Sequence, residues 1–182
     1  MPTNSRLFLR KESSSKGFTL IELVVGMLVI GIAIVMLTSM LFPQADRAAK
    51  TLQRVRSAEL AHSLMNEIWG KRYDQNTNAN GGTPACGSPT GKTCTLATEL
   101  GRDNISGVLE SRNNFNDVDD YNGLNETVTM LNSTQTYVDA YPNYRLSVSV
   151  VYGSVANTKL VTINVTTPDS EVITYNMVRS NY

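Results

Sequence analysis

The most constraining feature of this 182-residue chain is an apolar segment of 25 residues, Phe18–Phe42, in which Glu22 is the single charged residue. A helix of this length extends about 37 Å at about 1.5 Å per residue, and a hydrocarbon core is about 30 Å thick. We therefore expect residues 18–42 to form a membrane-spanning helix. This expectation argues against a fully soluble enzyme.

The charges of the chain are unevenly distributed around this segment. Residues 1–17 contain four basic residues and one acidic residue, whereas the rest of the chain contains 12 basic and 15 acidic residues. Because basic residues favour the cytoplasmic side of a membrane, we expect residues 1–17 in the cytoplasm and the chain after Phe42 outside it. The outer part has no basic surplus, so a nucleic-acid-binding domain is not expected.

A cleaved secretory signal peptide is the main alternative for the N-terminal segment. Its apolar region would have about 7–15 residues and would end at a small-x-small cleavage site. Gly31-Ile32-Ala33 fits such a site, but cleavage there leaves another apolar stretch, residues 34–42, at the new N-terminus. The charged Glu22 inside the apolar region also fits a signal peptide badly.

Glu22 itself allows two interpretations. A carboxylate inside a membrane span costs about 2.5–3.5 kcal/mol on insertion scales, and such residues usually have a functional partner. The simpler interpretation is that Glu22 lies one turn inside the interface, where its side chain reaches water or is protonated. The other is that Glu22 has a partner outside its own chain, and its neighbours in the sequence favour this.

These neighbours resemble the prepilin signature of type IV pilins and type II secretion pseudopilins. A short basic leader ends in Lys16-Gly17, Phe18 follows, Glu22 comes four residues later, and the apolar segment continues. The resemblance implies that a prepilin peptidase cleaves between Gly17 and Phe18. It also implies that residues 1–17 are a cytoplasmic leader and that Phe18 is N-methylated.

The same resemblance implies a filament in which the apolar helices of many pilin subunits pack together. The new amine of Phe18 stays cationic after methylation, so Glu22 of one subunit can neutralise the amine of its neighbour. A buried pair is tolerated where a lone buried carboxylate is not, and the pair would therefore set the axial register of subunits. The expected partners are prepilin peptidase, other pilin subunits and, before assembly, the inner membrane.

Pro43 ends the apolar segment, and the following residues predict more helix. The resemblance implies that Pro43 kinks a continuing helix, whereas proline alone predicts a break. Residues 44–69 contain no Gly or Pro and are rich in helix-forming residues. We expect residues 43–72 to be an amphipathic continuation with one apolar stripe. The stripe comprises Leu52, Val55, Ala58, Ala61, Met65 and Ile68.

Residues 73–125 are predicted to be an irregular loop region, because polar residues, Gly and Pro dominate its first part. This region contains the only two cysteines of the chain, Cys86 and Cys94. Two cysteines need further ligands to bind zinc, and the single histidine, His62, is expected on the surface of the preceding helix. Since the topology places this loop outside the cytoplasm, we predict a Cys86–Cys94 disulfide.

An acidic run in the same region allows two interpretations. Asp117, Asp119 and Asp120 are close in sequence, and calcium requires clustered oxygens. The run does not fit an EF-hand loop, because Tyr121 occupies a ligand position and Val128 stands where a bidentate glutamate belongs. We favour the alternative, a turn of Asp, Asn and Gly residues with solvated carboxylates and no metal.

Alternating apolar and polar residues predict an antiparallel sheet within residues 126–182. The main strands are expected over residues 145–152, 160–166 and 172–178, and shorter strands are allowed over 127–131 and 134–139. The expected fold class is therefore α+β, pilin-like, with a long N-terminal helix packed on a C-terminal antiparallel sheet.

The sequence contains no nucleotide-binding, nucleophile or zinc-hydrolase motif, so we expect neither an enzyme nor a cofactor. Two functions remain: a pilin-like subunit, or a periplasmic domain that uses the helix as a tether. Only the first explains Gly17-Phe18 and Glu22. Residues 40–49 and the acidic run resemble minor pilins of the mannose-sensitive haemagglutinin (MSHA) pilus system, and a type II secretion pseudopilin is the second possibility.

Overall fold

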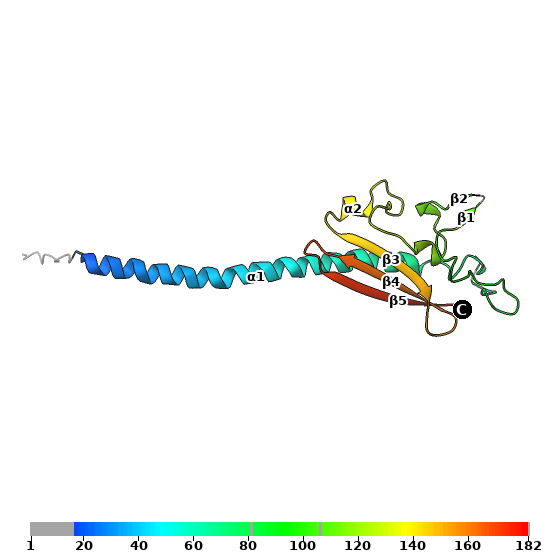
Figure 1. Ribbon diagram of the computed structural model, residues 1–182, viewed down its shortest axis with the longest axis horizontal. Coiled ribbons are helices and arrows are strands. Elements are labelled where there is room, and N and C mark those ends of the chain that lie inside the picture. Colours follow the sequence, from blue (N-terminus) through cyan, green and yellow to red (C-terminus); the bar gives the residue numbers. More distant parts are fainter. Residues whose placement is uncertain (1–16, 81, 106, 182) are drawn as a thin grey trace, which may run out of the picture. The chain divides into compact units, whose positions relative to one another are not determined.

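A long helix, α1 (Leu20–Trp69), dominates the N-terminal part of the structure, a computed structural model that describes residues 17–80, 82–105 and 107–181. The chain divides into two compact units, Met1–Arg47 and Ala48–Tyr182, and α1 contributes to both (Figure 1). The predicted leader lies outside the described residues except for Gly17.

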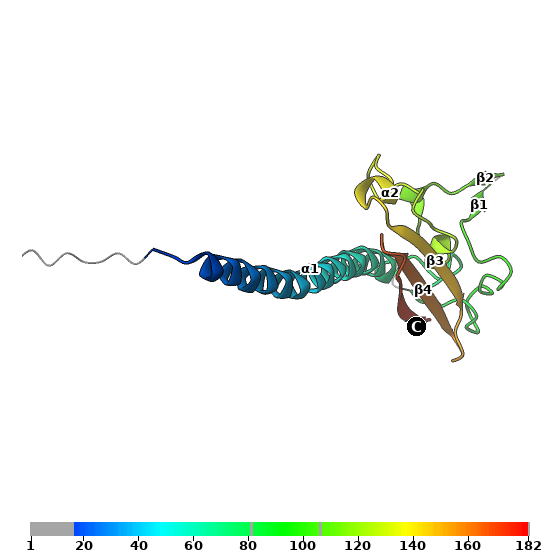
Figure 2. The same ribbon diagram turned by 60° about the vertical axis from the view of Figure 1, so that its left-hand side comes forward.

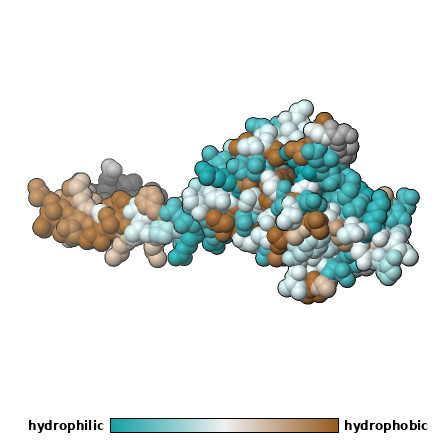
Figure 3. Space-filling model, turned by 45° about the vertical axis from the view of Figure 1, so that its right-hand side comes forward, coloured by the Kyte–Doolittle hydropathy of each residue, from teal (hydrophilic) through white to brown (hydrophobic). Residues whose placement is uncertain are grey.

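The described part of the first unit consists of the short segment before α1 and the apolar part of that helix. α1 is long and apolar enough to cross a membrane, and none of its most apolar 18-residue stretch is buried in the structure. Figure 3 shows hydrophobic side chains over this unit. The helix runs through Pro43, so the predicted continuation is confirmed, although the predicted kink stays a prediction.

The second unit combines the C-terminal part of α1 with a three-stranded antiparallel sheet. The strands are β3 (Arg145–Tyr152), β4 (Thr158–Thr166) and β5 (Val172–Ser180), in the order β3-β4-β5. The register places Val148 opposite Ile163 and Ile163 opposite Tyr175. Because α1 covers one face of the sheet (Figure 2), the predicted α+β architecture is confirmed.

Short elements occupy the chain between α1 and β3. They are β1 (Asn104–Ile105), β2 (Val108–Leu109), two 3-10 turns (Arg112–Asn114 and Asp119–Tyr121) and α2 (Tyr137–Ala140). The two additional strands that the sequence allowed do not form. A single bridge joins Thr129 to Thr136, and Thr136 then caps α2 by accepting a hydrogen bond from the backbone N–H of Asp139.

The core of the second unit lies between α1 and the inner face of the sheet. The alternation of the strands predicts this face correctly, since Val148 and Val150 of β3 and Val161 and Ile163 of β4 are at most 3% exposed. On α1, the fully buried apolar side chains are Leu60, Ala61, Leu64 and Ile68.

The predicted apolar stripe on α1 is therefore wrong at its N-terminal end. Leu52 and Val55 are 65% and 59% exposed. The buried face instead begins at Ser57, whose hydroxyl lies 3.2 Å from the hydroxyl of Tyr175 on β5. The regular apolar spacing begins at Leu52, N-terminal to the first buried residue of α1. Apolar spacing alone therefore does not show at which residue the helix begins to pack on the sheet.

Polar contacts also fix α1 on the second unit. Glu67 accepts two hydrogen bonds from the guanidinium of Arg112, at 2.6 and 2.7 Å, and one from the hydroxyl of Tyr121. On the exposed side, Arg54 makes a bidentate contact with Glu171 at 2.8 and 3.0 Å. The Arg112 pair is the more important of the two, because exposed ion pairs add little stability.

The outer edge of β3 is covered by the chain that follows the acidic run. The backbone N–H of Gly123 donates to the C=O of Val148, and the N–H of Val148 donates to the C=O of Leu124, both over 2.9 Å. The N–H of Val150 donates to Asn122 Oδ1 over 3.0 Å. These bonds fix the acidic run against the sheet. β5, at the other edge, has no partner strand among the described residues.

Helix α1 provides a matched test of the corrected core. We expect Leu64→Ala to lower the free energy of unfolding of the second unit by about 2–5 kcal/mol, because it opens a cavity at a buried position. Leu52→Ala is the control and should change it by less than about 0.5 kcal/mol. Urea unfolding of the full chain in detergent, followed by fluorescence of the single tryptophan, Trp69, measures both. Equal losses would contradict this description of the core.

Candidate processing and assembly site

The predicted cleavage site lies just before the first turn of α1. Gly17, Phe18 and Thr19 are outside regular secondary structure and exposed, with Phe18 84% exposed. A Cβ added at Gly17 would meet no atom within 4 Å. An exposed backbone without helical hydrogen bonds is the kind of segment that a protease can reach.

Thr19 and Glu22 together define the start of the helix. The backbone N–H of Glu22 donates to Thr19 Oγ1 over 3.3 Å, and the N–H of Leu23 donates to the C=O of Thr19 over 3.2 Å. Thr19 is therefore the N-cap, and Glu22 occupies the third helical position, where a carboxylate interacts favourably with the positive end of the helix. The Thr-x-x-Glu spacing indicates this local role of Glu22, which was not among the predictions.

The side chains around Glu22 provide no partner for its charge within the first unit. Leu20, Ile21, Leu23 and Val25 are between 52% and 83% exposed, and no ion pair to Glu22 occurs among the described residues. The segment thus presents an apolar surface with one carboxylate near its N-terminal end. Such a surface is suited to lipid or to other apolar helices.

Comparison with protein families found the prokaryotic N-terminal methylation motif at residues 13–38. The chain carries a prepilin-type methylation motif. The motif implies processing by a prepilin peptidase and assembly with other pilins, and it supports a pilin or pseudopilin subunit. With the apolar helix, it fits a membrane-anchored pilin. Searches of curated proteins and of solved structures gave no match.

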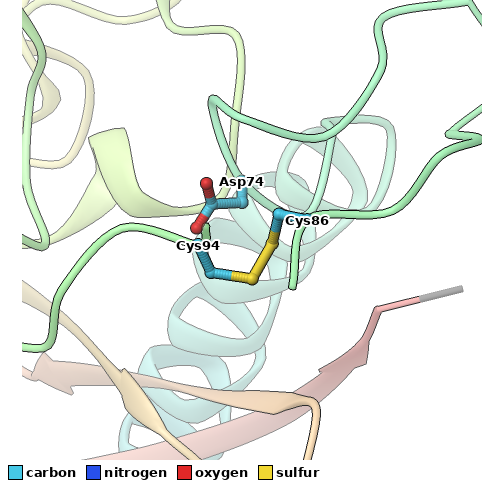
Figure 4. Close-up of side chains that lie close together, drawn as sticks. All are labelled: Asp74, Cys86 and Cys94. Carbon is cyan, nitrogen blue, oxygen red and sulfur yellow. A yellow bond between two sulfur atoms is a disulfide. The ribbon is translucent and has the colours of Figure 1, made fainter. Parts of the chain in front are cut away.

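The structure contains the predicted disulfide between Cys86 and Cys94. Figure 4 shows this disulfide close to the carboxylate of Asp74. The bond closes a short polar loop, and the Nδ2 group of Asn181, after β5, donates to the C=O of Cys86 over 2.9 Å. Because both sulfurs are in the disulfide, neither is available as a thiolate ligand for a metal.

The predicted turn with solvated carboxylates is wrong, because Asp117, Asp119 and Asp120 are only 1–2% exposed. They also do not converge on one point. Asp117 Oδ1 accepts the backbone N–H groups of Asp119 and Asp120, Asp119 binds Lys159, and Asp120 Oδ2 accepts the N–H groups of Asn116 and Asp117. A single calcium site made of these three residues is therefore not present in this arrangement.

Lys159 of β4 is a fully buried cation that the sequence analysis did not single out. Its Nζ donates to Asp119 Oδ1 at 2.5 Å, and to Asp74 Oδ2 and the C=O of Tyr73 at 2.9 Å. The rings of Tyr73 and Tyr152 lie 4.4 and 5.6 Å from it. Lys159 lies two residues before Val161 and therefore shares the inward face of β4 with apolar residues. A charged residue at an inward-facing position of a strand is the signal from which the buried lysine could have been predicted.

The ionisation of these carboxylates follows from their surroundings. Burial raises the pKa of Asp119 to about 6, although Lys159 opposes the shift. Burial, with the charges of Asp119 and Asp120, raises the pKa of Asp117 to about 8. Burial also acts to raise the pKa of Asp74, but hydrogen bonds from the N–H of Asn76 and from Lys159 hold it below its ordinary value. Lys159 therefore pairs with one strongly acidic and one weakly acidic group.

Replacing Lys159 tests whether this cluster stabilises the second unit. We expect Lys159→Met to lower the free energy of unfolding by about 3–5 kcal/mol, since two buried carboxylates lose their counter-charge. Lys92→Met, at an exposed loop position, is the control and should stay within about 0.5 kcal/mol of wild type. Urea unfolding of the full chain measures both. Similar values for the two variants would show that the cluster is not stabilising.

Replacing Gly17 tests the cleavage site. We expect Gly17→Val to leave residues 1–17 attached, because a β-branched side chain beside the scissile bond restricts the backbone that the peptidase must reach. Wild type should instead begin with N-methylated Phe18. Gly31→Val is the control, since a Cβ at Gly31 meets no atom within 4 Å, and it should be processed normally. Intact-mass spectrometry of membrane extracts measures this. Wild-type protein with Met1 intact, from cells with active peptidase, would exclude the predicted cleavage.

Proposed function

We propose that this chain is a minor subunit of a type IV pilus of the MSHA type, most like the MshD minor pilin, with a structural role in adhesion and not an enzymatic one. In this proposal the protein is inserted in the inner membrane with residues 1–17 in the cytoplasm. After cleavage and methylation it joins, or initiates, the filament. The second unit then lies first in the periplasm and later on the pilus.

The observation that carries this proposal is the combination of a cleavable Gly17-Phe18 junction, Glu22 and an apolar helix whose side chains stay exposed in the isolated chain. A tether alone requires the apolar helix but neither the junction nor Glu22. The assignment to the MSHA system is more specific than the assignment to a pilin-like subunit. It rests on the resemblance of residues 40–49 and of the acidic run to minor pilins of that system.

A type II secretion pseudopilin is the second candidate, because prepilin-type motifs occur in both systems. The two candidates differ in where the processed protein should be found. A pilus subunit should co-purify with filaments sheared from the cell surface, whereas a pseudopilin should be needed for secretion and be absent from those filaments. The same fractionation therefore decides between them.

Glu22 has two roles to separate, because it lies both in the first turn of α1 and in the apolar surface. If Glu22 neutralises the Phe18 amine of a neighbouring subunit, Glu22→Ala should leave a buried amine unpaired, at a cost of several kcal/mol. Membrane insertion and cleavage should continue, since both precede contact between subunits. The result expected is a large loss of the protein from sheared filaments relative to the membrane fraction.

Two further variants distinguish charge from helix capping. Glu22→Gln keeps the shape without the charge and should fail as Glu22→Ala does. Thr19→Ala removes the N-cap contact to the N–H of Glu22 but keeps the carboxylate, so it should still be incorporated. If Thr19→Ala fails like Glu22→Ala, capping explains the defect. If all three variants are incorporated into filaments as wild type is, Glu22 does not mediate assembly. That result would favour the interpretation of the helix as a tether.

A further inference from the structure

Three carboxylates from separate segments meet in the second unit, apart from the Lys159 cluster. Asp103 precedes β1, Glu110 follows β2, and Asp120 lies in the second 3-10 turn. A carboxylate oxygen of each lies within 4.8 Å of those of the other two. The β1–β2 hairpin brings the first two together, because the backbone N–H of Glu110 donates to the C=O of Asp103 over 2.8 Å.

Each of these side chains has one buried oxygen without a hydrogen-bond partner: Asp103 Oδ2, Glu110 Oε2 and Asp120 Oδ1. Glu110 is 8% exposed and Asp120 is 1% exposed. The second oxygens of these two are occupied, since Asp120 Oδ2 accepts two backbone N–H groups and Glu110 Oε1 accepts Asn116 Nδ2 over 3.1 Å. The oxygens without hydrogen-bond donors are therefore the ones still available to a ligand.

The cluster also has no counter-charge in contact. Every ion pair found in the described part of the chain involves other carboxylates. Arg72 is near enough to act on Asp103, but its guanidinium donates to Gln75, Thr77 and Asn116 instead. Burying several carboxylates without a cation is costly, because each loses its hydration. A bound cation would remove that cost.

We propose that Asp103, Glu110 and Asp120 form a calcium-binding site. Calcium takes oxygen ligands at about 2.3–2.6 Å, so two oxygens on opposite sides of one ion lie about 4.6–5.2 Å apart. The three oxygens lie within 4.8 Å of one another, so their separations are in the range that a single calcium ion can bridge after small side-chain adjustments. Calcium also accepts irregular geometry and water as a ligand, whereas magnesium requires shorter distances and a near-ideal octahedron.

Two cavities adjoin members of the cluster, and Arg102 lines both of them. Asp103 lines a cavity of about 700 Å³, and Asp120 lines one of about 260 Å³. The ion would join the β1–β2 hairpin to the 3-10 turn Asp119–Tyr121, which the following residues fix to β3. Calcium would thus order this part of the loop region. This proposal concerns the second unit alone and does not depend on the proposed pilin function.

Calcium titration of the full chain in detergent micelles, after treatment with chelator, tests the site. Calcium-binding modules outside the cytoplasm have dissociation constants of about 10⁻⁴–10⁻³ M. With calcium at about 50 times such a constant, we expect the Tm of the second unit to rise by roughly 5 °C. Magnesium at the same concentration should produce a much smaller rise. Terbium luminescence that calcium displaces gives a second readout, which does not depend on unfolding.

The variants Glu110→Gln and Asp103→Asn keep side-chain shape and remove one carboxylate each, whereas Asp120 is left intact because it also holds two backbone N–H groups. Each should weaken calcium binding at least tenfold, and in chelator neither should have a lower Tm than wild type. Asp169→Asn, at an exposed turn position, is the matched control and should bind as wild type does. The proposal is overturned if calcium at 100 times the upper dissociation constant neither raises Tm nor displaces terbium. It is also overturned if magnesium is equally effective, or if the variants bind as wild type does.

Discussion

The exposed apolar surface of residues 18–42 determines the environment that this protein requires. Eighteen large apolar side chains of this segment are between 50% and 84% exposed in the isolated chain. Full burial of such a side chain contributes about 1.5–3 kcal/mol, so the surface as a whole represents on the order of tens of kcal/mol. Net domain stability is only about 5–15 kcal/mol. A lipid bilayer or a bundle of similar helices must therefore surround this segment.

The second unit has a separate source of stability, since its core lies between α1 and the sheet and contains nothing from the apolar segment. Local sequence predicts much of this unit. The alternation in β3, β4 and β5 gives both the strands and their inner faces, because residues two apart share a face of a strand. The helix, the loop region and the disulfide are also predicted, since each depends on composition or on residues close in sequence.

Pairing across long sequence distances is the part that sequence reasoning missed. The buried face of α1 was misplaced at Leu52 and Val55, because a stripe of apolar spacing does not show where the sheet ends. The acidic run was assigned to a solvated turn because it is rich in Asp, Asn and Gly and does not fit an EF-hand loop. Its counter-charge, Lys159, is 40 residues away from Asp119 and 85 from Asp74. At the N-terminus, the methylation motif that contains Gly17, Phe18 and Glu22 could be recognised from the sequence, since the motif is one contiguous segment.

The loop region between α1 and β3 has little regular structure, and buried polar groups take the place of strand ladders there. The ion pair between Glu67 and Arg112 connects the loop region to α1, and Lys159 connects it to β4. Residues 122–126 bind the edge of β3 through hydrogen bonds. Such contacts are individually costly to bury and stabilise only when every partner is present. A region that depends on such mutually dependent contacts is expected to unfold cooperatively. Asp119 Oδ2 and Arg112 Nε in this network lack a hydrogen-bond partner, as do single oxygens of Asp103, Glu110 and Asp120. Only the last three oxygens belong to carboxylates that lie together without a cation among the described residues, and the proposed calcium ion would supply that missing partner.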